Sequence, residues 1–316
     1  MARPNPAEVK RVAIIGTGLI GGAWAALCLA RGIEVRASDP SPDGEAHLKK
    51  IIERGWPVLE RLGLAPGASP ARYTFHRDPL EAIEGVAFVQ ENAPEVKTLK
   101  VDLLAMIDAK LPPEIVLASS TSGFLPSRLY AKCRHPERVV VGHPFNPPYL
   151  IPLVEVVGGP KTSRDVVDWT ADFYQRLGKR PLKLRREIEG FVANRLQAAI
   201  FREIIHLAKE DVASIADIDA AVSQGPGLRW AVMGPCLTFH LARQTGIKDF
   251  IDLFAAMFND YNLASGRTEV DRVTYDRMVE GTLAEAGTRS LDKLSAARDE
   301  AVLGFIQLLR ERDVPR

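Results

Sequence analysis

A strand, a glycine-rich turn and a helix follow one another near the start of the chain, and this order constrains the fold most. Residues 12–15, Val-Ala-Ile-Ile, form a short apolar run that is typical of a buried strand. The run ends in the turn 16–21, Gly-Thr-Gly-Leu-Ile-Gly, and an Ala- and Leu-rich helical stretch continues to residue 31. Gly32 ends that helix, and residues 33–39 alternate as a second strand. The segment therefore predicts a βαβ unit.

The glycine spacing predicts a dinucleotide site. A lone GxGxxG is a weak match because glycine is common, but here it follows a strand, opens a helix and precedes an acidic strand end. The glycines allow a tight turn, the approach of a pyrophosphate and close helix packing, while free N–H groups at the helix start bind phosphate oxygens. Asp39, 18 residues beyond the last glycine, is expected to accept hydrogen bonds from a ribose and to repel a 2′-phosphate. NAD is therefore favoured over NADP, with FAD or a ligand-free turn as alternatives, and the predicted cofactor residues are Gly16, Gly18, Leu19, Ile20, Gly21 and Asp39.

Strand-like and helix-like segments alternate over the first half of the chain, which predicts a doubly wound α/β sheet. Residues 41–64 carry an apolar helical stripe and are predicted as an inserted helical hairpin. Strand signals become sparse after about residue 187. A length of 316 residues favours two domains, and we predict a Rossmann-type NAD-binding domain at 1–189 and an all-helical substrate and dimerisation domain at 190–316. The further candidate strands are 73–75, 86–89, 115–119, 139–143 and 154–157.

Composition narrows the class of partner. The 41 Lys and Arg residues nearly balance the 40 Asp and Glu residues, so no global field draws the chain to nucleic acid or to an anionic membrane. No apolar run approaches the roughly 20 residues that span a bilayer, and the three cysteines show no CxxC spacing. The six histidines lack metal-ligand spacing, so no metal is predicted. We expect a cytoplasmic protein with a small-molecule partner.

An acidic residue inside an apolar strand points to a catalytic pair. Glu155 lies in the run 153–157, Leu-Val-Glu-Val-Val, and His143 lies 12 residues earlier, before a proline-rich segment. Burial disfavours an ionised Glu unless it is paired, and a carboxylate holds an imidazole in one orientation and tautomer. Imidazole is suited to accept the hydroxyl proton when a secondary alcohol is oxidised. His143 and Glu155 are therefore predicted as a base and its orienting partner.

From residue 12 through most of the C-terminal helices, the chain resembles the L-3-hydroxyacyl-CoA dehydrogenase superfamily. The motifs that carry the resemblance are the Ser-Ser-Thr-Ser turn at 119–122, His143 before Asn146-Pro147, Glu155, and Gly-Phe-Val-Ala-Asn-Arg at 190–195. The resemblance implies that Ser122 and Asn194 support the pair, and that Glu91 and Lys97 run past the nicotinamide ribose. From the residues alone, Ser122 is equally a helix cap, Asn194 a partner for backbone groups, Glu91 a helix-start acid and Lys97 a solvated lysine.

Within that superfamily the similarity is closer to the L-carnitine dehydrogenases and to the lambda-crystallin or L-gulonate 3-dehydrogenase group. A Gly-Leu-Arg-Trp-Ala segment at 227–231 carries Arg229, and a guanidinium binds a free carboxylate by two parallel hydrogen bonds. Trp230, Tyr149 and Phe145 offer aromatic faces to a trimethylammonium group, or simply pack. The expected reaction is the NAD-dependent oxidation of a small free 3-hydroxy acid, with carnitine ahead of gulonate.

The sequence also allows two alternative functions and predicts one assembly. A 3-hydroxyacyl-CoA dehydrogenase is supported by Lys49 and Lys50, where cations meet CoA phosphates. A crystallin-like structural protein is opposed by the intact His143 and Glu155 pair. The apolar helices after residue 190 and the resemblance predict a homodimer through the helical domain.

Overall fold

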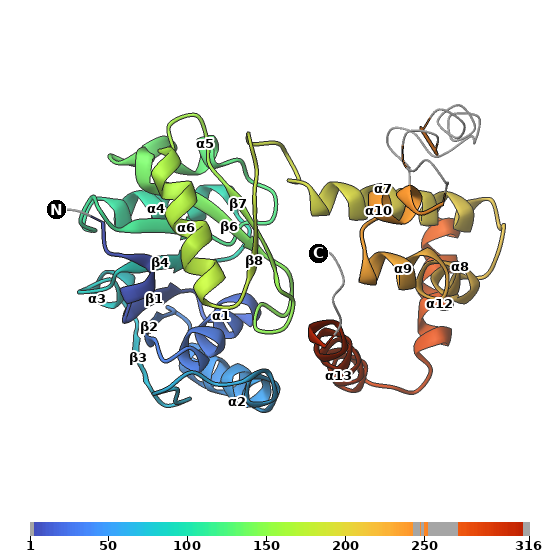
Figure 1. The fold of residues 1–316 in the computed structure, drawn as a ribbon, viewed down its shortest axis with the longest axis horizontal. Coiled ribbons are helices and arrows are strands. Elements are labelled where there is room, and N and C mark those ends of the chain that lie inside the picture. The colour runs from blue at the N-terminus through green and yellow to red at the C-terminus, as the bar shows by residue number, and fades with distance from the viewer. Residues whose placement is uncertain (1–2, 243–246, 248–249, 252–270, 312–316) are drawn as a thin grey trace. The chain divides into compact units, whose positions relative to one another are not determined.

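The structure is a computed structural model that describes residues 3–242, 247, 250–251 and 271–311. The chain forms two compact units, residues 1–194 and residues 195–316. The first is α/β and the second is helical (Figure 1). The predicted fold class, a Rossmann-type doubly wound sheet followed by an all-helical domain, is confirmed. The predicted functional boundary after residue 189 stays a prediction.

The first unit is built on an eight-stranded sheet with the order β3-β2-β1-β4-β5-β6-β7-β8. Neighbouring strands are parallel except for β6 and β7, which are antiparallel. The strand order reverses between β1 and β4, and ligands of doubly wound sheets bind at the carboxyl ends of the strands at such a point. The strands are β1 (Arg11–Ile15), β2 (Glu34–Ser38), β3 (Tyr73–His76), β4 (Phe88–Glu91), β5 (Val116–Ser119), β6 (Val139–Pro144), β7 (Leu153–Val157) and β8 (Arg180–Lys183).

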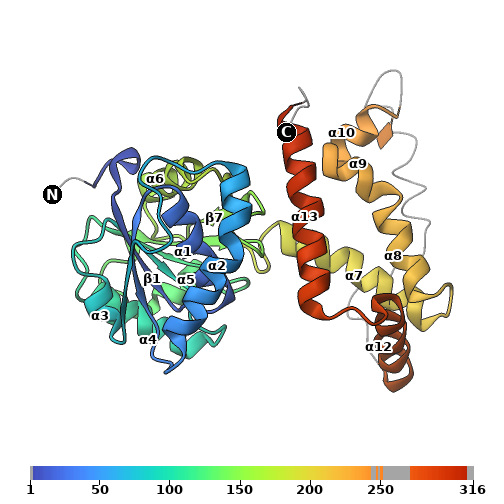
Figure 2. The same ribbon diagram turned by 90° about the horizontal axis from the view of Figure 1, so that it is seen from below.

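Helices cover both faces of this sheet. Trp24 of α1 stacks on Tyr174 of α6 with ring centroids 5.2 Å apart, so these helices share one face. Helices α3 and α4 lie on the opposite face (Figure 2), over a core of alternate strand residues such as Val89, Leu117 and Val141. The helices are α1 (Leu19–Ala30), α2 (Gly44–Leu62), α3 (Pro79–Ala82), α4 (Lys97–Asp108), α5 (Pro126–Leu129) and α6 (Arg164–Arg176), with short 3-10 turns η1 (Pro6–Glu8), η2 (Tyr130–Lys132) and η3 (Pro136–Arg138).

The predicted helical hairpin at 41–64 is wrong. Residues 44–62 form the single helix α2, which continues through Pro57. Its buried positions Leu48, Ile52, Gly55 and Leu59 follow the period of one helix, so one unbroken stripe packs against α1. The stripe outweighs the cost of a proline inside the helix.

In the second unit every described element is a helix. The helix α7 begins two residues before the unit does, and α12 approaches α8 closely: a Cβ built at Gly281 would lie 2.5 Å from Ile215 Cγ1. Among the described helices, none is long and apolar enough to cross a membrane. The helices are α7 (Ala193–Lys209), α8 (Ile215–Ser223), α9 (Pro226–Val232), α10 (Pro235–His240), α12 (Arg272–Ala286) and α13 (Leu291–Arg310).

We expect Gly142→Ala to lower the free energy of unfolding by about 1–3 kcal/mol, the usual cost of overpacking a core. A Cβ at Gly142 would lie 1.8 Å from the hydroxyl oxygen of Tyr174, whose hydrogen bond to Gln90 (2.6 Å) would be displaced. Urea unfolding measures the loss. Gly123→Ala is the matched control, because no heavy atom lies within 4 Å of its added Cβ. Equal stability of the two variants would contradict the prediction.

Candidate active site

The glycine turn fits a dinucleotide. Gly16 has φ +87°, and a Cβ there would lie 2.7 Å from the backbone of Asn92. A Cβ at Gly21 would lie 1.8 Å from the Gly16 carbonyl oxygen, whereas Gly18 is exposed with no atom within 4 Å of its Cβ position. Helix α1 begins at Leu19 without a side-chain cap or an acidic residue in its first turn, so its N–H groups are open to an anion.

Asp39 follows β2 and holds this turn. Its Oδ2 accepts hydrogen bonds from the backbone N (2.8 Å) and the hydroxyl (3.2 Å) of Thr17, and its Oδ1 accepts one from Ser41 N (2.9 Å). The half-buried carboxylate therefore fixes the loop in which the glycines lie, and its contact with a ribose stays a prediction. Leu19 is exposed, whereas Ile20 lines the cavity described below.

His143 and Glu155 form a buried pair across the antiparallel strands β6 and β7, where they are register partners. His143 Nδ1 and Glu155 Oε2 lie 2.8 Å apart. The other carboxylate oxygen, Oε1, accepts hydrogen bonds from Val192 N (2.8 Å) and Ala193 N (3.0 Å) at the start of α7. The carboxylate thus has three donors, from two separate segments.

Burial alone would raise the pKa of Glu155, but the hydrogen bond from His143, the two backbone N–H donors and the charge of His143 together lower that pKa below its ordinary value. The group is therefore a carboxylate near neutral pH. A carboxylate only accepts, so Nδ1 is the donor of the pair and Nε2 is the ring nitrogen left to take up a proton.

The backbone before α7 is shaped for this contact. Gly190 has φ +74° and Phe191 has φ +52°, and these consecutive left-handed residues turn the next two N–H groups toward Glu155. Phe191 is fully buried, and its ring centroid lies 5.5 Å from that of His143. The strain of a non-glycine residue at positive φ is offset by this burial and by the contact with the pair.

A cavity of about 260 Å³ joins the cofactor turn to the pair. The backbone N of Ser122 donates to Glu95 Oε1 (2.9 Å), and its carbonyl accepts a hydrogen bond from Asn194 Nδ2 (2.8 Å). The structure therefore places the four predicted catalytic residues in one neighbourhood. The cavity is lined by Ile20, Asn92, Ala93, Glu95, Lys100, Ser120, Ser122, His143 and Pro144.

Glu95 and Lys100 reach this cavity, whereas Glu91 and Lys97 do not line it. Glu91 is fully buried: Oε1 accepts from Lys100 Nζ (2.9 Å), and Oε2 accepts from Ser119 Oγ (2.5 Å). A ribose contact of Glu91 would require these partners to move. Sequence reasoning missed Lys100, although it lies on the apolar face of α4, where a lysine needs a carboxylate.

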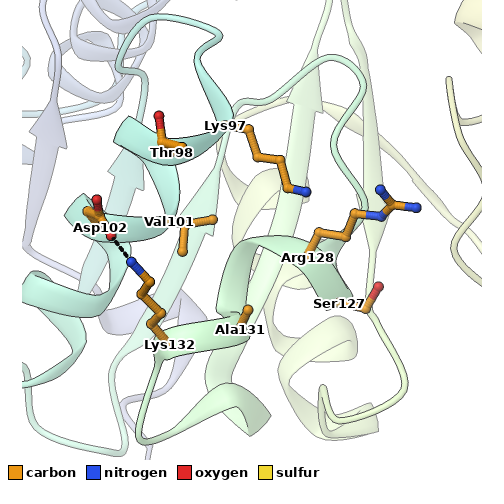
Figure 3. A pocket seen from close by; sticks show the side chains of 8 residues that line it. All are labelled: Lys97, Thr98, Val101, Asp102, Ser127, Arg128, Ala131 and Lys132. Carbon is orange, nitrogen blue, oxygen red and sulfur yellow. Dashed lines mark hydrogen bonds and ion pairs between the residues drawn. The ribbon is translucent and has the colours of Figure 1, made fainter.

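Lys97 is exposed at the start of α4 and lines a different cavity of about 510 Å³ (Figure 3). Arg128 and Lys132 border the same cavity, and Lys132 is paired there with Asp102 (2.6 Å). The predicted ribose contact of Lys97 stays a prediction.

The four predicted substrate residues are distributed over both units. The ring of Phe145 lies 4.9 Å from that of His143, and Tyr149 is buried against α2, where a Cβ at Gly55 would lie 2.9 Å from its ring. Arg229 is exposed and Trp230 half-buried on α9 of the second unit. Among the described residues, no group of three or more His, Cys, Asp or Glu is placed to hold a metal ion.

The fold and the site define an NAD-binding dehydrogenase. Residues 11–188 match the NAD-binding domain of 3-hydroxyacyl-CoA dehydrogenase, and residues 190–285 match its C-terminal domain. The chain belongs to the 3-hydroxyacyl-CoA dehydrogenase family, so the predicted resemblance and the NAD cofactor are confirmed.

Relatives along the whole chain narrow the comparison. The chain is 48% identical to an L-carnitine dehydrogenase of Streptomyces griseus, over 96% of this chain and 90% of that protein. It is 43% identical to an L-carnitine dehydrogenase of Pseudomonas aeruginosa, over 96% and 95%. A solved NAD⁺-dependent dismutase, 5-formyl-3-hydroxy-2-methylpyridine 4-carboxylic acid 5-dehydrogenase, superposes with a TM-score of 0.83 at 29% identity, over 96% of this chain and 100% of that one.

We expect Gly18→Ala to keep the wild-type melting temperature and to weaken NADH binding by about tenfold or more, because the added methyl meets no protein atom but stands where a pyrophosphate approaches. Gly21→Ala should lower both the melting temperature and the affinity for NADH, since its Cβ would lie 1.8 Å from the Gly16 carbonyl oxygen. Thermal melts and calorimetric titration with NADH measure the two effects. Unchanged NADH affinity in Gly18→Ala would count against the assigned pyrophosphate position.

Proposed function

We propose that the protein oxidises the 3-hydroxyl group of L-carnitine to the 3-oxo group of 3-dehydrocarnitine, with NAD⁺ as the oxidant. The observation that carries this proposal is the buried His143–Glu155 pair beside a dinucleotide turn. The substrate rests on the near full-length similarity to L-carnitine dehydrogenases.

The pair assigns the path of the proton. Bound NAD⁺ would accept the hydride that leaves the carbinol carbon. His143 accepts the hydroxyl proton at Nε2, because Nδ1 is held by Glu155 Oε2. Glu155 stabilises the resulting imidazolium, and its hydrogen bonds to Val192 N and Ala193 N keep the carboxylate in place as the charge changes. Ser122 and Asn194 hold the polar edge of the cavity through their mutual hydrogen bond.

Charge supports the proposed placement of a zwitterionic substrate. Glu95 and Lys100 line the cavity as an ion pair (3.5 Å), and the buried Glu91 pairs with the same ammonium (2.9 Å), so two carboxylates share one ammonium at this wall. Such a wall disfavours a free carboxylate and tolerates a cation. We propose that the substrate carboxylate binds Arg229, whose side chain is exposed, and that aromatic faces of Trp230, Phe145 and Tyr149 meet the trimethylammonium group.

L-Carnitine, L-gulonate and L-3-hydroxybutyryl-CoA should be compared by the absorbance of NADH. We expect turnover of L-carnitine, a loss of about 10²–10⁴-fold in kcat for His143→Gln, and a raised KM for Arg229→Met. His135→Gln is the matched control, because His135 also meets a carboxylate, Glu137 at 3.1 Å, but on the surface.

Turnover of the thioester alone, indifferent to Arg229→Met, would instead assign an acyl-CoA substrate. Lys49 and Lys50, exposed on α2, would then be the cations to test. Turnover of L-gulonate alone would identify L-gulonate as the substrate. No turnover of any of the three would favour a structural role.

We further propose a homodimer formed through the helical unit. Leu196, Ile200 and Phe201 expose apolar surface along α7. Light scattering should give about twice the chain mass of 34.7 kDa, and Leu196→Asp with Phe201→Asp should yield monomers. Ala216→Asp, at an exposed position of α8, is the control. A monomer mass for the wild type contradicts this assembly.

We also propose that the protein is cytoplasmic. Cys28, Cys133 and Cys236 are all free thiols. Reduced cysteines are typical of a reducing compartment.

A further inference from the structure

Lys179, between α6 and β8, is a buried ammonium outside the catalytic pair. It is 6% exposed, and among the described residues no carboxylate forms an ion pair with it. Its Nζ donates to the carbonyl oxygens of Pro148 (2.8 Å) and Ile151, and lies 5.3 Å from the ring centroid of Trp24. Burial lowers the pKa of Lys179 to about 7. The partners of this cation are therefore backbone carbonyls and an aromatic face.

Both carbonyls belong to residues 145–152, which connect β6 to β7 and so join His143 to Glu155. Within this connection, Leu150 N and Ile151 N donate to the Pro147 carbonyl at 3.0 and 2.9 Å. At its start lies Phe145, with its ring 4.9 Å from that of His143. The ammonium thus fixes the far end of a segment whose near end contacts the proposed base.

Trp24 extends these contacts to two residues that line the cavity. Its indole N–H donates to Ser120 Oγ (3.2 Å), and Ser120 Oγ donates to Asn92 Oδ1 (2.7 Å). Ser120 and Asn92 both line the cavity that contains His143. Lys179 therefore contacts the connection between the two paired residues and, through Trp24, two residues that line the cavity.

The pair itself has supports that do not involve Lys179. His143 and Glu155 are held by the pairing of β6 with β7 and by the N–H groups of Val192 and Ala193. The glycine turn is held by Asp39. Loss of the ammonium should therefore disturb the connection while sparing proton transfer and cofactor binding.

We propose that Lys179 is a positioning residue for the hydroxy acid: it fixes the connection 145–152, and with it Phe145 beside His143, so that it sets substrate affinity rather than the rate of the chemical step. The effect on affinity rests on the proposed function, whereas the effect on the connection does not.

Lys179→Met keeps the length of the side chain but removes its donors and charge. We expect the KM for L-carnitine to rise about tenfold, the factor that about 1.4 kcal/mol gives, while kcat and NADH affinity stay within about threefold of wild type. Lys183→Met, exposed on β8 and paired only at the surface with Asp168 (2.7 Å), is the matched control. If the methionine variant does not fold, Lys179→Gln is measured in the same way.

Hydrogen exchange gives a readout that needs no substrate. The amides of Leu150 and Ile151 should exchange faster in Lys179→Met than in the wild type or Lys183→Met, whereas the amides of β1 should not change. Unchanged exchange at 150–151 overturns the proposal whatever the substrate is. A rise in KM accompanied by similar losses of kcat and of NADH affinity also overturns it, because Lys179 would then support the whole unit.

If the wild type turns over gulonate or the thioester but not carnitine, the proposed substrate fails alone, and the KM comparison is made with the acid or thioester that reacts. If it turns over none of them, the proposed function fails, and the exchange rates alone decide the role of Lys179.

Discussion

The hydrogen bonds of the buried Glu155 carboxylate are the interactions on which the rest of the site depends. A carboxylate without exposure would be protonated unless donors compensated the loss of water, and here His143, Val192 N and Ala193 N supply them. Those donors come from β6 and from the start of α7, so the strand pairing and the helix start are both constrained by one side chain. The left-handed backbone of Phe191 follows from the same requirement.

The parallel sheet brings the cofactor turn to this pair. Gly16 follows β1, Asn92 follows β4 and Ser120 follows β5, and the carboxyl ends of parallel strands lie at one edge. Strand β6 continues this direction and places His143 near its own carboxyl end. Strand β7 then returns antiparallel, so that Glu155 reaches His143 from the neighbouring strand. One reversal of direction in the sheet therefore brings the His143–Glu155 pair to the edge where the glycine turn lies.

Local patterns predicted the features that depend on neighbouring residues. The glycine turn and the acid within the apolar run at 153–157 were both readable because their reasons lie within a few positions. The need for glycine at position 142 of β6 was not readable, because it comes from the hydroxyl of Tyr174 on helix α6. The segment 41–64, predicted as a hairpin, is one helix because the apolar stripe that packs on α1 continues across Pro57. Lys179 looks like a surface lysine in sequence, and only the tertiary fold buries it.

Lys100 and Lys179, the two lysines buried in the described part of the chain, differ in how their charge is compensated. Lys100 meets the buried Glu91 at 2.9 Å and Glu95, which lines the cavity, at 3.5 Å, so two carboxylates share its charge. Lys179 donates to carbonyl oxygens and lies over the face of Trp24, and among the described residues no carboxylate pairs with it. The net negative charge of Lys100 with its two carboxylates disfavours a carboxylate in the cavity, so the carboxylate of the proposed hydroxy acid needs a cationic partner elsewhere, the role proposed for Arg229.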